Sequence, residues 1–101
     1  MLLHLATALA AANALVAKHP LLPAEEIIPS KHGVAVHLHG GFADFEAWRE
    51  ALNIPPQSLY LRCNRTNAVL RAETVFNGVP VSLVGYSSLL PEEPALRAVA
   101  A

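Results

Sequence analysis

The sequence is poor in cysteine: Cys63 is the only one among 101 residues. A single thiol cannot form an internal disulfide or a cysteine-based zinc site, so nothing here requires an oxidising compartment. Charge is also scarce, because only 15% of the residues are Asp, Glu, Lys or Arg, and these sum to a net charge of −1. Electrostatic nucleic-acid-binding proteins usually carry a clear basic excess, so this balance argues against that class.

Long uninterrupted hydrophobic runs are missing as well. Residues 1–17 are the most apolar stretch, but His4, Thr7 and Asn13 interrupt them, and the basic start of a signal peptide is lacking. We therefore expect a cytoplasmic protein without a membrane span, and a cleaved or uncleaved export signal is the alternative for this stretch. The apolar residues recur at three- and four-residue steps, which predicts an amphipathic surface helix that ends before Pro20. Its packed side is expected to carry Leu2, Leu5, Leu9, Ala12 and Val16.

Hydrophobic residues are abundant, at 53% of the chain. This composition excludes disorder, and the length suffices for one compact domain but not for a TIM barrel or a complete dinucleotide-binding domain. We expect a single domain over residues 1–90 and a tail over residues 91–101 that is flexible or forms a short helix.

Two short strands and a second helix are predicted after Pro20. Residues 34–39 alternate between two faces before a Gly-Gly pair, and residues 26–28 form a possible edge strand. Asp44 is a suitable N-cap for the helix, which we expect to turn Arg49 toward water. The packed side of this helix is expected to carry Phe45, Trp48 and Leu52.

Residues 58–86 predict a three-stranded meander. Asn77-Gly78 is the strongest hairpin signal in the chain, and residues 64–67 form the other turn. Closing both turns places the apolar residues of all three strands on one face, and a slip of one residue would turn every side chain over. The expected opposite pairs are Phe76 with Val79, Thr74 with Val81, Ala72 with Leu83, Cys63 with Ala68, Leu61 with Leu70, and Leu59 with Ala72.

These elements predict an α+β fold of the order α-β(β)-α-β-β-β: an antiparallel sheet of four to five strands with two helices on one face. The helices are expected to cover the leucine-rich face, where Cys63 would be a buried, inert thiol. The other face then collects the candidate interaction residues, which are His37, His39, Tyr60, Arg62, Arg71, Glu73 and Tyr86.

Several functions compete for that second face. A non-enzymatic protein-interaction or regulatory module would present this face, or an edge strand, to a second copy of itself or to another protein. Val69, Val75 and Val84 lie on the face among tyrosine and arginine, which is typical of such surfaces. A single-stranded nucleic-acid-binding protein is the alternative, although Glu73 and the net charge disfavour it. An ordinary solvated sheet face remains the simplest explanation. The leading prediction is the interaction module, a homodimer without a cofactor. The nucleic-acid alternative would use Tyr60, Arg62, Arg71 and Tyr86.

His37 and His39 have the spacing of a metal-binding pair. Two imidazoles two residues apart on a strand project from the same face and can share one ion. Zinc needs at least a third protein ligand, which His32, Asp44 or Glu73 could supply only through folding. The pattern is weak on its own, so two surface histidines without a metal are the expectation.

The segment His39-Gly40-Gly41-Phe42 is similar to the oxyanion-loop segment of hormone-sensitive-lipase-like α/β hydrolases. The nucleophile turn would have to lie in residues 85–89, which lack the second glycine, and no catalytic histidine follows them. The chain is also too short for that fold. We therefore expect no enzyme, and we assign the two glycines to a tight strand-to-helix turn.

Three segments taken together resemble a known group of proteins. They are Ala17-Lys18-His19-Pro20 at the end of an alanine-rich helix, the segment 45–52 (FEAWREAL) and the closing Asn77-Gly78 hairpin. Over most of the chain they are similar to short uncharacterised proteins of high-GC actinobacteria and their phages or mobile elements. The resemblance implies a cytoplasmic accessory protein, and it transfers no catalytic or binding residue.

Overall fold

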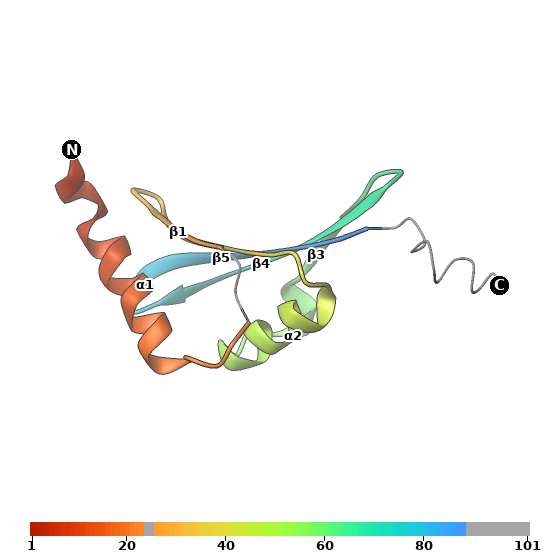
Figure 1. The fold of residues 1–101 in the computed structure, drawn as a ribbon, viewed down its shortest axis with the longest axis horizontal. Helices are drawn as coiled ribbons and strands as arrows, with labels where there is room; N and C mark the ends of the chain where they lie inside the picture. Colours follow the sequence, from red (N-terminus) through yellow and green to blue (C-terminus); the bar gives the residue numbers. More distant parts are fainter. Residues whose placement is uncertain (24–25, 89–101) are drawn as a thin grey trace.

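The computed structural model describes residues 1–23 and 26–88, in which two α-helices lie on one side of a five-stranded sheet (Figure 1). The helical elements are the 3-10 turn η1 (Leu2–Leu5), α1 (Ala6–Lys18), α2 (Phe42–Ala51) and the 3-10 turn η2 (Pro56–Ser58). The strands are β1 (Glu26–Ser30), β2 (Gly33–Leu38), β3 (Tyr60–Cys63), β4 (Asn67–Phe76) and β5 (Val79–Ser88). The tail predicted over residues 91–101 lies outside the described residues.

The strand order is β1-β2-β5-β4-β3, with β5 at the centre. The α+β class and the two helices on one face are confirmed, and η1 and η2 are additions to the predicted element order. The prediction of a purely antiparallel sheet is wrong, because β2 and β5 run parallel. The connection through α2 leads into β3, which begins at the level of His37, near the end of β2, and continues in the same direction. β5 also runs in that direction after two further reversals.

The registers predicted for the meander are confirmed within the strands. Asn77 and Gly78 have φ values of 51° and 78°, as a two-residue type I′ turn requires. Leu59 precedes β3, so its predicted pair with Ala72 falls outside the ladder. The observed opposite pairs are Phe76 with Val79, Thr74 with Val81, Ala72 with Leu83, Cys63 with Ala68, and Leu61 with Leu70.

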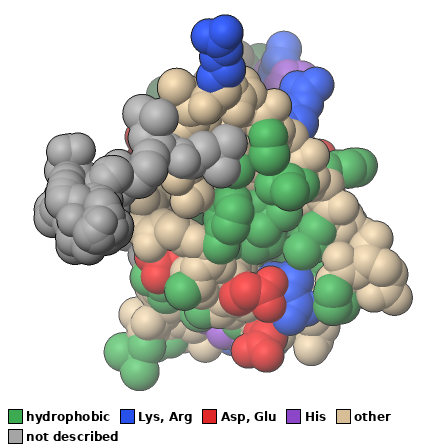
Figure 2. Space-filling model, turned by 90° about the vertical axis from the view of Figure 1, so that its right-hand side faces the viewer, with side chains coloured by type: hydrophobic (Ala, Val, Ile, Leu, Met, Phe, Trp, Pro, Cys, Tyr) green, Lys and Arg blue, Asp and Glu red, His purple; other side chains and the backbone are tan. Residues whose placement is uncertain are grey.

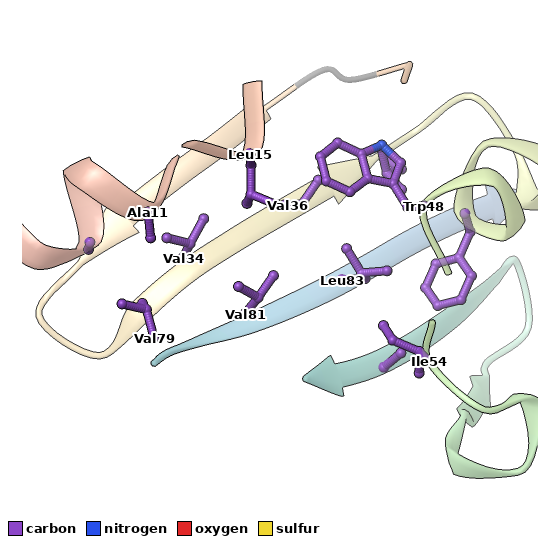
Figure 3. Packing of buried hydrophobic residues seen from close by; sticks show 13 residues of the cluster. Ala11, Leu15, Val34, Val36, Trp48, Ile54, Val79, Val81 and Leu83 are labelled. Carbon is purple, nitrogen blue, oxygen red and sulfur yellow. The ribbon is translucent and has the colours of Figure 1, made fainter. Parts of the chain in front are cut away.

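The core lies between the helices and the sheet, as Figure 3 shows. Every second residue of β2 enters it, and α2 contributes Phe45 and Trp48, as predicted. The indole nitrogen Nε1 of Trp48 donates a hydrogen bond of 2.5 Å to the carbonyl of Pro23. This bond ties α2 to the segment between α1 and β1, so the packing of the two helices is linked.

The packed side of α1 differs from the predicted one. Leu2, Leu9 and Val16 of the predicted stripe are exposed, whereas Ala12 packs partly buried against the core. Alanine side chains allow a helix to approach a sheet more closely than leucine does, and the side rich in small residues therefore faces the core. The buried residues of α1 are Ala8, Ala11 and Leu15.

The start of α2 also differs, because its N-cap is Gly41 and Asp44 lies in its first turn. The φ of Gly41 is 100°, a region that favours glycine, so the tight strand-to-helix turn predicted from the glycine pair is present. An acidic residue in the first turn still interacts favourably with the positive end of the helix.

β3 projects beyond the helices. All four of its residues are exposed, and Leu61 is 59% exposed although it lies on the helix side of the sheet. The prediction that Cys63 is buried is therefore wrong, because the thiol is exposed at this end of the molecule. Figure 2, which views the end where α2 and β3 lie, shows hydrophobic side chains gathered at the surface.

Arg49 does not face water as predicted, since its side chain is only 13% exposed. Its Nε donates to Oε2 of Glu46 at 2.8 Å, and its Nη1 donates to the carbonyl of Ile54 at 2.7 Å. The guanidinium therefore secures the chain where it leaves α2. The hydrogen bond from Arg49 to Glu46 holds the pKa of the Glu46 carboxyl below its ordinary value.

The pKa of Glu46 is lower in the folded state than in the unfolded state. The ionised carboxyl therefore stabilises the fold above its unfolded pKa, and this stabilisation is lost as pH falls through the folded pKa. We expect Glu46→Gln to lower the melting temperature slightly at neutral pH. The difference from the wild type should shrink as pH falls from neutral through the lowered pKa of Glu46, because the wild-type carboxyl then becomes protonated too. Thermal unfolding followed across this range tests it, and a difference that does not depend on pH contradicts it.

α2 reaches the sheet at Gly85, on the helix side of β5. A Cβ atom at this position would lie 2.9 Å from Cδ2 and 3.2 Å from Cβ of Phe45. We expect Gly85→Ala to lower the free energy of unfolding by about 1–3 kcal/mol, as overpacking of a core does. Urea denaturation measures the change. Ser82→Ala, on the other face of the same strand, is the matched control and should stay within about 0.5 kcal/mol of the wild type. An unchanged midpoint for Gly85→Ala would show that the contact is loose.

Candidate functional site

The face of the sheet turned away from α1 and α2, here called the outer face, brings the seven predicted interaction residues together. One row of directly opposed residues runs across all the strands in the order Glu26, His37, Val84, Arg71 and Tyr60. The adjacent rows hold Arg62, Val69 and Tyr86 on one side, and Glu73, Ser82 and Ala35 on the other. His39 follows the end of β2, beside Tyr86.

The outer face combines apolar area with divided charge. Val84 is 4% exposed at the middle of the row, whereas Tyr60 and Val75 are 58% and 66% exposed. Glu26 lies on the β1 side, and the two arginines lie on the side formed by β3 and β4, where Glu73 is their acidic neighbour. The two halves of the face therefore differ in charge.

A shallow hollow of about 410 Å³ lies at the end of the face where β2 stops, and its lining includes His39, Tyr86 and Asn67. A second hollow, of about 570 Å³, lies on the side of β3 and β4. Its outer-face lining residues are Tyr60, Arg62, Val69, Arg71 and Glu73.

The histidine cluster lies on the β1–β2 side of the face. We define it as Glu26 of β1, His37 of β2, His39 just after β2, and Tyr86 of the neighbouring strand β5. Nδ1 of His37 lies 3.9 Å from Oε1 of Glu26 and 3.5 Å from the hydroxyl of Tyr86. The rings of His39 and Tyr86 are stacked, with 4.6 Å between centroids and 4° between planes. The arrangement gathers two imidazoles, a carboxylate and a phenol at one corner of the sheet.

Glu26 is the member of the cluster that sequence reasoning missed. His32, Asp44 and Glu73 were the candidates for a third ligand beside His37 and His39, and the structure brings Glu26 there instead. The signal was present in the turn between β1 and β2. Pairing Ser30 with Gly33 and counting back along both strands places Glu26 opposite His37.

Comparison of the chain with protein-family models, with curated proteins and with solved structures found no match. The resemblance to short actinobacterial and phage proteins therefore stays a prediction, and so does the cytoplasmic location. Within residues 1–23 and 26–88, no helix has the length and apolar character needed to cross a membrane.

Proposed function

We propose that the protein is a non-enzymatic interaction module that acts as a homodimer, in which the outer faces of two copies pack against each other. The observation that carries the proposal is the composition of that face. It exposes Ile28, Tyr60 and Val75, and Tyr60 lies directly opposite Arg71. Tyrosine and arginine are enriched where proteins meet. A second copy is the favoured occupant because the face complements itself in charge and in shape.

The charge argument follows from the strand order. A two-fold axis parallel to the central strand β5 places the β1–β2 half of one copy over the β3–β4 half of the other. Glu26 of one copy then lies over Tyr60 of the second copy. Arg71 of the second copy is the neighbour of Tyr60 in the same row. Opposite charges meet at both ends of the interface, which favours this pairing over unrelated ones.

The shape argument follows from the twist of the sheet, which Figure 1 shows edge-on. Two sheets with the same right-handed twist pack well when their strands are nearly aligned, as in a β-sandwich. Four strand spacings and the ten residues of β5 define a face of up to about 19 Å by 33 Å. This approaches the roughly 800 Å² that each partner buries in a standard interface.

Light scattering coupled to size-exclusion chromatography tests the dimer, and a charge swap tests the interface. We expect Arg71→Glu and Glu26→Arg each to weaken the dimer about tenfold or more, because each places like charges opposite each other. The double variant should regain most of the wild-type affinity. Glu50→Arg on α2, away from the outer face, is the matched control. A strictly monomeric wild type at high micromolar concentration contradicts the proposal.

Single-stranded nucleic-acid binding is the second candidate function, and the hollow lined by Tyr60, Arg62 and Arg71 favours it. A protein that binds the phosphate backbone of nucleic acids shifts mixed oligonucleotides in a gel at low salt and releases them as the salt concentration rises. This candidate predicts that the double variant with Arg62→Ala and Arg71→Ala loses the retention, whereas Lys18→Ala on α1 keeps it. The absence of any shift for the wild type at low salt excludes this function.

A further inference from the structure

We propose that Glu26, His37 and His39 bind one zinc ion on the outer face. The site requires residues of a single copy, so it goes beyond the proposed homodimer and does not depend on it. Two imidazoles and one carboxylate form a donor set that zinc uses in proteins, with three protein ligands and one position left open.

The backbone fixes where the three ligands start. Glu26 and His37 are direct partners in the antiparallel ladder of β1 and β2, and His39 projects from the same face just past the end of β2. One ligand atom from each residue lies within 4.8 Å of the other two. Ligands at about 2.0–2.2 Å from a tetrahedral ion are about 3.4 Å apart, so movements of about 1 Å in side-chain atoms close the site.

Tyr86 holds both imidazoles from the neighbouring strand β5. Its hydroxyl lies 3.5 Å from Nδ1 of His37, and its ring stacks on His39. Contacts of this kind limit the rotation of the two imidazole rings before the metal arrives. Tyr86 is therefore a positioning residue of the proposed site.

The ligands are accessible and leave room for a fourth ligand. In the single copy the side chains of His37 and Glu26 are 27% and 56% exposed, so an ion reaches them directly from solvent. The hollow that His39 and Tyr86 line offers space for a water molecule or a small anion at the open position. Imidazole nitrogens favour zinc and its first-row neighbours, whereas magnesium and calcium prefer oxygen-only ligands.

Titration of the untagged full chain with zinc chloride, in competition with a chromophoric chelator, tests the site. We expect one zinc ion per chain, confirmed by native mass spectrometry, and no competition from an excess of magnesium. His37→Ala and His39→Ala should each weaken zinc binding at least tenfold, and Tyr86→Ala should weaken it about tenfold. His4→Ala and His32→Ala remove histidines outside the cluster, and they should leave the affinity unchanged.

Glu26→Gln provides the conservative test, because it keeps the size of the side chain and removes a charged ligand. It should also weaken zinc binding about tenfold. Circular dichroism shows whether each variant keeps its fold. The proposal is overturned if the wild type binds no stoichiometric zinc at micromolar concentration, or if folded His37→Ala and His39→Ala variants bind it as the wild type does. Light scattering of the same samples reports dimerisation separately, so one proposal can fail without the other.

Discussion

The pairing of β2 with β5 is the interaction on which the rest of the structure depends. It joins two units that local turns already define, the β1–β2 hairpin and the β3–β4–β5 meander. The start of this pairing requires Gly33, whose φ is 132° and whose missing Cβ makes room for the carbonyl of Pro80. The helices can then pack on a single continuous surface, because the alternate residues of β2 and β5 lie on one side.

The same pairing assembles the outer face. Glu26 and His37 belong to the hairpin, whereas Arg71 and Tyr60 belong to the meander, and only the parallel pair of β2 and β5 puts them in one row. The same pairing brings Tyr86 of β5 next to the two histidines. The proposed interface and the proposed zinc site thus share a scaffold, and they also share Glu26. A zinc ion at that corner would outweigh the negative charge of Glu26, and the positive charge that remains would change the charge pattern that a second copy meets.

The parts of the fold that the sequence predicted are those that short turns encode. Asn77-Gly78 and the turn at residues 64–67 set the registers of the meander, and strand alternation separated His37, Tyr60 and Arg71 from the core. The direction of β2 against β5 could not be read in this way, because these strands meet without a turn between them. The packed side of α1 was missed because the fit of alanines against the sheet outweighed the leucine periodicity. The exposure of Cys63 depends on how far α2 extends over β3, which no local pattern records.

The edges of the sheet limit how copies of this protein can associate. β1 is a five-residue edge strand that contains Pro29, a residue without an N–H donor, and β3 at the opposite edge has only four residues. Both edges are therefore poor templates for the addition of another strand. Strand-by-strand growth of the kind that builds fibrils is disfavoured at each of them, whereas the proposed contact between two outer faces would close on itself as a dimer.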